Sequence, residues 1–190
     1  MPVPSTMAPL ARLMQSGKAL GCLLLLLMLR MESAMGVQGA SAKSMEVERQ
    51  ALLAFKQDLI DEHGRLSSWG GSRNCCDWAG VECSSKAGHV IGLNLGAAIA
   101  SSPAVGTMTL KGKISRSLLE LKRLAHLDLN YNDFGLNPIP EFIGFLPKLT
   151  FLNLSFSNFS GSIPTQLGNA SSLRVLNLSF NPIGSTSLDW

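Results

Sequence analysis

The sequence has few charged and few aromatic residues. Of its 190 residues, 15% are charged and 6% are aromatic. Its 16 basic and 13 acidic residues leave a net charge of +3, which argues against nucleic-acid binding by bulk charge and against a charged, disordered tail. The length allows a single domain, or a small domain with appendages, and excludes a chain that also carries a kinase.

The sequence also lacks the patterns of an enzyme or a metal site. Its three histidines, His63, His89 and His126, are scattered along the chain, and no histidine pair stands at zinc-ligand spacing near the cysteines. His126 and Asp128 share one face of an expected strand, but no nucleophile with an oxyanion-type turn and no glycine-rich phosphate loop accompanies them. We therefore expect no catalysis, no metal and no cofactor.

Apolar runs of membrane-spanning length are absent as well. The stretch Ala19–Leu29 has eleven residues, whereas a spanning helix needs about 20. Arg12 and Lys18 precede it without any acidic residue, and small residues follow it. This pattern is typical of a signal peptide, which we predict over residues 1–42 with cleavage between 36 and 42. An uncleaved N-terminal anchor is the alternative.

The chain has four cysteines, and one of them, Cys22, falls in the predicted signal peptide. Entry into the oxidising secretory pathway favours a disulfide among the other three, Cys75, Cys76 and Cys83. Adjacent cysteines rarely bond each other without backbone strain, so the sequence favours a Cys76–Cys83 bridge, worth roughly 2 to 3 kcal/mol on the chain-entropy estimate. Cys75 is then left without a partner.

An internal repeat is the strongest signal in the sequence. The phrase Leu-x-x-Leu-x-Leu begins at Leu124, Leu149 and Leu173, at offsets of 25 and 24 residues. A weaker copy begins at Val90, which requires about ten additional residues to be looped out, most simply within Ala97–Met108. The paired leucines of each copy point inward from a short strand, and stacked neighbouring coils must bury them.

The repeat predicts an α/β solenoid, a short coil with parallel strands. Asn132 and Asn181 stand where two of the strands turn away, and a buried side-chain amide there can bond free backbone groups of adjacent turns. Before the repeat, a helix is expected from Ser44. Its apolar stripe and two tryptophans should cover the first coil as core residues: Ala51, Leu52, Phe55, Leu59, Trp69 and Trp78.

The segment Phe159–Pro164 fits the phrase Leu-x-Gly-x-Ile-Pro, with phenylalanine in the first place. Together with Glu48–Lys56, Leu66–Trp69 and Cys75–Cys83, it resembles plant extracellular leucine-rich-repeat proteins with a plant-type N-terminal cap. Phrases such as Asn132-Asp133-Phe134 are similar to receptor-like proteins, including the fungal-xylanase receptors. The resemblance implies a right-handed coil and a disulfide-containing cap.

The resemblance also divides the chain. It implies a cap over 43–89 and about 3.7 leucine-rich repeats over 90–190. Two features depart from the family. Met45 stands near the place where the family has a cysteine that pairs with the first of the adjacent cysteines, and the chain ends at Trp190 inside its fourth coil. We therefore interpret the chain as a truncated receptor, whose contact with the membrane depends on a missing C-terminal anchor or an uncleaved N-terminal segment.

The outward side chains of the strands form the expected ligand-binding face. The candidates are His126, Asp128, Asn130, Tyr131, Phe151, Phe156, Val175 and Phe180. Exposed aromatic residues beside hydrogen-bonding groups suit a peptide or protein ligand. The alternative is that these aromatic side chains merely pack sideways on their neighbours in the repeat.

By resemblance, the chain recognises an extracellular peptide or protein, with a leucine-rich-repeat co-receptor kinase as a further partner, in immune or developmental signalling. The expected location is the apoplast, or the outer face of the plasma membrane for a full-length parent. Two alternatives stay open: a secreted inhibitor of the polygalacturonase-inhibiting type, and a partial gene product without a signalling role.

Four Asn-x-Ser sequons, at Asn153, Asn158, Asn169 and Asn177, are candidate glycosylation sites in a secreted chain. Asn169 follows Gly168 on the turn away from the strands and is the best candidate. Glycans on Asn153 or Asn177 would lie on the expected binding face.

Overall fold

The computed structural model describes residues 43–71, 74–97 and 108–184. The predicted signal peptide, with its cleavage window and Cys22, lies outside the described residues. So do residues 98–107 of the segment expected to loop out.

The described part begins with an α-helix over 43–57 and continues with short strands and 3-10 helices. The strands are β1 (Leu59–Ile60), β2 (Val81–Cys83), β3 (Val90–Asn94), β4 (Lys111–Gly112), β5 (His126–Asp128), β6 (Phe151–Asn153) and β7 (Val175–Asn177). The 3-10 helices are η1 (Cys75–Asp77), η2 (Arg116–Glu120), η3 (Glu141–Phe145) and η4 (Thr165–Asn169).

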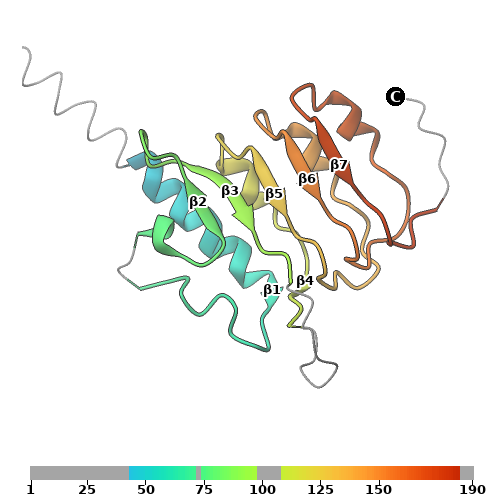
Figure 1. Ribbon diagram of the computed structural model, residues 1–190, viewed down its shortest axis with the longest axis horizontal. Helices are drawn as coiled ribbons and strands as arrows, with labels where there is room; N and C mark the ends of the chain where they lie inside the picture. The colour runs from blue at the N-terminus through green and yellow to red at the C-terminus, as the bar shows by residue number, and fades with distance from the viewer. Residues whose placement is uncertain (1–42, 72–73, 98–107, 185–190) are drawn as a thin grey trace, which may run out of the picture. The chain divides into compact units, whose positions relative to one another are not determined.

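Five strands form one sheet in the order β2-β3-β5-β6-β7, in which only the β2–β3 pair is antiparallel (Figure 1). The strands of successive coils are in register, so that Leu93, Leu127, Leu152 and Leu176 lie side by side. This arrangement confirms the predicted repeat solenoid with parallel strands. The backbone N–H and C=O groups of β5 and β6 are thus hydrogen-bonded to the strands of the neighbouring coils on both sides.

The core lies between the sheet and the 3-10 helices of the same coils. Leu127 and Leu152 are fully buried, and each helix adds apolar side chains from the other side, such as Leu118 in η2 and Ile143 in η3. In the fourth coil, Leu176 is only half-buried. Burial of this ladder removes apolar surface from water and is the main stabilising term.

The predicted role of the ladder asparagines is confirmed. The Asn132 Nδ2 donates to the carbonyls of Leu95 and Leu129, both at 2.9 Å, while its Oδ1 accepts from Leu110 N at 2.9 Å. Asn181, in the fourth coil, makes the corresponding bonds. Its Nδ2 donates to the carbonyls of Leu154 and Leu178, and its Oδ1 accepts from the backbone N–H groups of Ser157 and Phe159. In the third coil Ser157 takes this place, and its hydroxyl donates to Leu129 O at 2.8 Å.

The cap covers the first coil as expected. Trp69 and Trp78 are each 2% exposed and stack with ring centroids 5.5 Å apart, which confirms them as core residues. Trp69 Nε1 donates to Ala79 O at 2.8 Å. Cys76 and Cys83 form a disulfide, and Cys75 is a buried free thiol.

One expectation for the cap is wrong. Leu59 is buried, but it does not continue the helical stripe, because the helix stops at residue 57 and Leu59 belongs to β1. Strand β1 pairs antiparallel with β4, so that Leu59 faces Gly112. The chain thus leaves the helix early to hydrogen-bond with the edge of the second coil.

Candidate functional site

The outward face of the sheet carries three columns of side chains, one residue from each coil. In the first column, His126 stacks on Phe151 with ring centroids 4.1 Å apart and planes 6° apart. Val175 follows Phe151 in register and is 46% exposed. This column is a flat surface of mixed polar and apolar character.

The second column is polar, but its groups are largely engaged with one another. Asn153 is 9% exposed, and its Nδ2 donates to Asp128 Oδ2 at 3.2 Å. Asp128 Oδ1 in turn accepts from the backbone N–H of Asn130 at 3.0 Å. Asn177 Oδ1 accepts from Ser179 N at 3.1 Å. These contacts leave the second column less free to bond a partner than the sequence suggested.

The third column is a ladder of Tyr131, Phe156 and Phe180, which we call the aromatic ladder. Their ring centroids lie 4.5 Å apart between Tyr131 and Phe156 and 4.0 Å apart between Phe156 and Phe180. Phe156 is 38% exposed and Phe180 is 73% exposed. The rings therefore pack sideways on each other and also present apolar surface to solvent. The column thus has features of a packing ladder and features of a binding surface.

The backbone of the aromatic ladder has an unusual conformation. All three residues have positive φ, at 52°, 53° and 58°. This left-handed region is uncommon for residues other than glycine, and hydrogen bonds to the next coil support it at two of the three positions. Tyr131 N donates to Ser155 O, and Phe156 N donates to Ser179 O, both at 3.0 Å. Contacts between coils thus hold the backbone at Tyr131 and Phe156, and with it the position of these two rings.

A hollow of about 320 Å³ lies against the aromatic ladder. The three rings form part of its wall, and the remaining lining residues are Thr109, Asn132, Asn158 and Pro182. Asn158 Nδ2 donates to Asp133 Oδ1 at 2.7 Å, and this hydrogen bond lowers the pKa of the Asp133 carboxyl. The hollow thus has an apolar wall and a few polar groups, as ligand sites commonly do.

The structure brings together some of the predicted site residues and separates others. The aromatic ladder borders the hollow, while His126, Phe151 and Val175 lie in the first column. Asn130, directly before Tyr131 in the sequence, is half-buried and does not line the hollow. Sequence reasoning missed Thr109 and Pro182. Pro182 stands two residues after Phe180, so the repeat spacing could have indicated it. Thr109 follows the irregular insertion, where no repeat position can be assigned.

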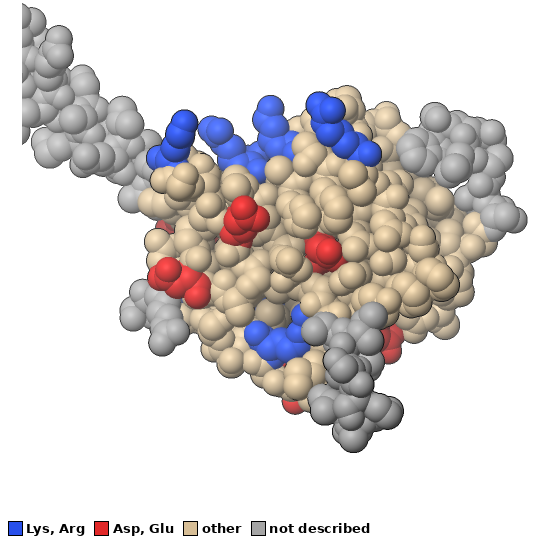
Figure 2. Space-filling model, viewed as in Figure 1, with Lys and Arg blue, Asp and Glu red and all other residues tan. Residues whose placement is uncertain are grey.

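Basic side chains gather along the edge of the sheet where the strands begin (Figure 2). The exposed basic residues in the four positions before β3, β5, β6 and β7 are Lys86, Lys122, Arg123, Lys148 and Arg174. Lys122 lies 3.8 Å from Glu120, a pair in which both side chains are more than half exposed and which contributes little. We call these basic residues the basic edge. It concentrates positive charge at the end of the face where the strands begin.

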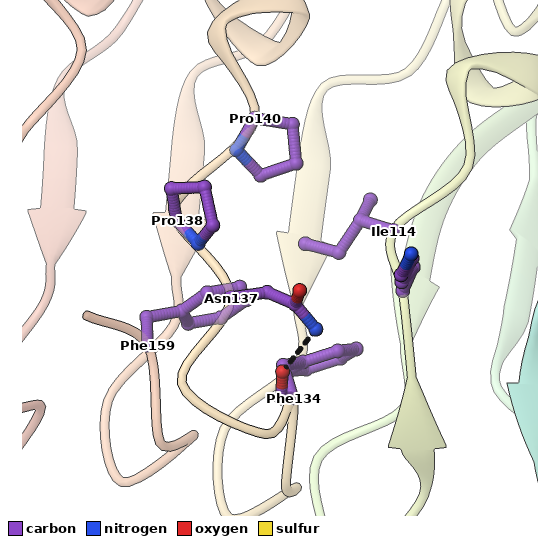
Figure 3. Close-up of a pocket in the computed structure, with 7 residues that line it drawn as sticks. Ile114, Phe134, Asn137, Pro138, Pro140 and Phe159 are labelled. Atoms are coloured by element: carbon purple, nitrogen blue, oxygen red, sulfur yellow. Dashed lines mark hydrogen bonds between the residues drawn. The ribbon is translucent and has the colours of Figure 1, made fainter. Parts of the chain in front are cut away.

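A second hollow, of about 220 Å³, lies on another side of the coils (Figure 3). Phe134 and Phe159 form its floor, stack at 4.8 Å and are each 1% exposed. The Asn137 Nδ2 at its rim donates to Phe134 O at 2.6 Å. Since its amide is already bonded and its rings belong to the core, we interpret it as a packing hollow.

Within residues 43–71, 74–97 and 108–184, no group of His, Cys, Asp and Glu is arranged to hold a metal ion. Over the same ranges, no helix has the length and apolar character needed to cross a bilayer.

Comparison with known sequences gives consistent matches. Residues 45–84 match the leucine rich repeat N-terminal domain, and residues 148–170 and 169–189 match leucine rich repeats. The chain is similar to the receptor-like proteins EIX1 and EIX2 of Solanum lycopersicum, at 42% identity over 169 residues and 46% over 143 residues. The alignments cover 86% and 73% of this chain but only 16% and 14% of those proteins. The chain therefore spans a small part of their length.

Solved structures of plant receptor ectodomains are similar to this chain in fold and in sequence. A chain in the BIR3–SERK2 complex from Arabidopsis thaliana matches with a TM-score of 0.61 and 36% identity, covering 70% of this chain and 68% of that chain. The leucine-rich-repeat ectodomain of the Arabidopsis thaliana receptor kinase GASSHO1/SCHENGEN3, in complex with CASPARIAN STRIP INTEGRITY FACTOR 2, matches with a TM-score of 0.57 and 32% identity. That match covers 70% of this chain and 15% of the ectodomain. The cap, the register of the coils and these similarities show that the chain belongs to the leucine-rich-repeat family of plant receptor-like proteins and receptor ectodomains.

Proposed function

We propose that this chain is an extracellular recognition module of a plant receptor-like protein and that it binds a peptide or protein through its strand face in immune or developmental signalling. The observation that carries the proposal is the aromatic ladder, which borders a hollow on that face and of which Phe156 and Phe180 are exposed. Aromatic side chains held rigidly are the usual anchors of protein interfaces, because they bury a large area at little entropic cost.

The comparisons support the kind of partner. The GASSHO1/SCHENGEN3 ectodomain was solved with CASPARIAN STRIP INTEGRITY FACTOR 2, and BIR3 was solved with SERK2. By analogy, the partners of this chain are an extracellular peptide or protein and a co-receptor kinase. The surface acts by complementarity and carries out no catalysis.

The structure also supports entry into the secretory pathway. The Cys76–Cys83 disulfide fits an oxidising compartment, in keeping with a signal peptide over 1–42. In this proposal the cap comprises 43–89 and the repeats 90–190. The location is the apoplast, or the outer face of the plasma membrane in a full-length receptor.

The basic edge favours partners that carry negative charge. A partner that carries acidic groups toward the start of the strands would be attracted to Arg123, Lys148 and Arg174. Such attraction mainly increases the association rate, and it weakens as salt is added.

A peptide-display experiment tests the proposal. The secreted chain is used to enrich a random-peptide library, and the selected peptides are titrated against a variant with Tyr131→Ala, Phe156→Ala and Phe180→Ala. We expect at least a tenfold loss of affinity, since each well-packed aromatic anchor contributes more than about 1 kcal/mol. The matched control is Leu136→Ala, which truncates an apolar side chain that is 55% exposed and lies outside the hollow.

Two results would contradict the proposal. Selected peptides that bind the triple variant as tightly as the wild type would leave the aromatic ladder with a packing role only. Inhibition of a fungal polygalacturonase by the purified chain would favour the secreted-inhibitor alternative.

A further inference from the structure

A third hollow, of about 260 Å³, lies at the turns that follow η3 and η4. Two segments of neighbouring coils line it, residues 144–147 and residues 169–172. Phe145 and Asn169 both border it and are 24 residues apart, which is the spacing between Phe151 of β6 and its partner Val175 in β7. They therefore hold equivalent positions in adjacent coils, one beside the other.

The two coils approach closely because of a glycine. A Cβ added at Gly144 would overlap the backbone carbonyl of Gln166, so a larger residue there would push η4 away from η3. On the other side of the hollow, Ser172 Oγ donates to Pro147 O at 3.3 Å. These contacts fix the distance between the segment that carries Phe145 and the segment that carries Asn169.

Phe145 gives the hollow an apolar wall, and Asn169 on the neighbouring coil is a candidate site of modification. Phe145 is 54% exposed, so a large part of this apolar residue meets solvent. Asn169 is exposed and begins the sequon Asn169-Ala170-Ser171. Its backbone carbonyl accepts from Ser171 N at 2.8 Å, while its side-chain amide has no hydrogen-bond partner within the described part of the chain.

Two of the other sequons engage the amide nitrogen in a hydrogen bond, and the third, Asn177, is half-buried and accepts from Ser179 N at 3.1 Å through its Oδ1. The Nδ2 of Asn153 donates to Asp128, and the Nδ2 of Asn158 donates to Asp133. Asn153 is also 9% exposed. Asn169 is thus the sequon that combines an exposed amide with an adjoining hollow.

We propose that Asn169 carries an N-linked glycan and that the first N-acetylglucosamine of this glycan lies in the hollow, stacked on the ring of Phe145. The proposal rests on the secretory route proposed above. It adds a docking site, on the chain's own surface, for the sugar attached to it.

The attachment step is transfer from a lipid-pyrophosphate-linked oligosaccharide. The bond between the sugar C1 and the pyrophosphate oxygen breaks, a bond between C1 and Asn169 Nδ2 forms, and Nδ2 gives up one proton to solvent. One face of a pyranose ring carries mainly C–H groups, so stacking it on Phe145 removes apolar surface from both partners. The volume lies below the roughly 300 Å³ of the smallest drug-sized pockets, which suits one sugar ring.

The experiment uses the full chain secreted from plant or insect cells. Mass spectrometry of its peptides gives the occupancy of Asn169, and the folded protein is then treated with a peptide N-glycosidase that removes the glycan at Asn169. We expect Phe145→Ala to accelerate native deglycosylation at Asn169 about fivefold, since losing a contact of about 1 kcal/mol changes a population by that factor. Phe145→Tyr, which keeps the ring, should retain the wild-type rate.

Thermal unfolding gives a second readout. Removal of the glycan should lower the melting temperature of the wild type by roughly 2 to 4 °C for a chain of this size, and should leave that of Phe145→Ala unchanged. The matched control is Leu136→Ala, which removes a side chain of equal exposure that does not line this hollow. In Leu136→Ala the rate and the glycan-dependent shift should stay at their wild-type values.

The negative outcomes are distinct from one another. Secretion with Asn169 unmodified overturns the docking proposal and leaves the proposed function standing. A glycan on Asn169 whose removal is equally fast in the wild type and Phe145→Ala overturns the docking alone. Absence of the chain from the secretory pathway overturns both proposals.

Discussion

Arg65 of the cap donates from Nη1 to Asn132 Oδ1 at 2.9 Å, so the cap and the asparagine ladder share one hydrogen-bond network. The other terminal nitrogen, Nη2, donates to Leu95 O at 2.8 Å and to Gly96 O at 2.9 Å. Burial lowers the pKa of Arg65, and Asp61 opposes this shift. The guanidinium therefore satisfies backbone groups at the end of the first coil and links them to the second coil.

Removing this link should destabilise the chain. We expect Arg65→Ala to lower the free energy of unfolding by about 2 to 3 kcal/mol, because several acceptors lose a charged donor. Chemical denaturation of the purified chain measures the change. Arg123→Ala, at an exposed position, serves as the control and should stay within about 0.5 kcal/mol of the wild type. A similar small effect for Arg65→Ala would show that water replaces the guanidinium without cost.

The two ladder asparagines should differ in their contribution. Asn132 is 3% exposed and Asn181 is half-buried, although both bond the same kinds of backbone group. We expect Asn132→Ala to cost roughly 3 kcal/mol of stability and Asn181→Ala about 1 kcal/mol, since water can reach the place of the half-buried Asn181 side chain more easily than that of the buried Asn132 side chain. Equal losses in urea unfolding would contradict this ranking.

The helix of the cap is fixed to the first strand by a buried carboxylate. Glu48 is 3% exposed, and its two oxygens contact His89 Nδ1 at 2.9 Å and Val90 N at 3.0 Å. Glu48→Ala leaves the Val90 N–H buried without a partner and should cost about 2 to 3 kcal/mol. Glu120→Ala changes a carboxylate that is 54% exposed and should have little effect. Hydrogen exchange at the Val90 amide should rise in Glu48→Ala alone, and unchanged exchange would argue against this anchor.

Cys75 should be protected from thiol reagents while the chain is folded. It is 3% exposed, and burial, with the nearby charge of Glu48, raises the pKa of its thiol. A raised pKa favours the neutral thiol in the fold, so this contribution to stability is complete below the thiol's unfolded pKa and is lost as pH rises through the folded pKa. Maleimide labelling should therefore be slow in the native chain and fast in denaturant.

Cys75→Ser is the variant that checks the source of that pH dependence. It should reduce the loss of stability at alkaline pH, measured as the difference in the free energy of unfolding between neutral and alkaline buffer. Rapid labelling of the native wild type would contradict the burial of Cys75.

The sequence predicted the parts of the fold that repeat. Leu127, Leu152 and Leu176 recur at fixed spacing because each coil meets the same neighbours, so their register could be derived without coordinates. The same spacing located the aromatic ladder, because Tyr131, Phe156 and Phe180 occupy one position of the repeat. Periodicity carries this information wherever the same contact is made in every coil.

Contacts made only once were not predictable in this way. Arg65 reaches Asn132 across 67 positions of sequence, and neither its type nor its place signals the bond. Leu59 fits a helical spacing, but the pairing of β1 with β4 ends the helix first. The engagement of Asn153 with Asp128 depends on how two adjacent coils stack, which residue types alone do not give.

The left-handed backbone at Tyr131, Phe156 and Phe180 has a consequence for how such a surface can diversify. Hydrogen bonds from the backbone N–H groups of Tyr131 and Phe156 to the next coil support these dihedral angles, and these bonds do not involve the rings. Asparagine or glycine, which adopt this conformation readily, can replace an aromatic residue there without disturbing the turn. New specificities are thus accessible by exchanging single rings, while the scaffold beneath keeps its shape.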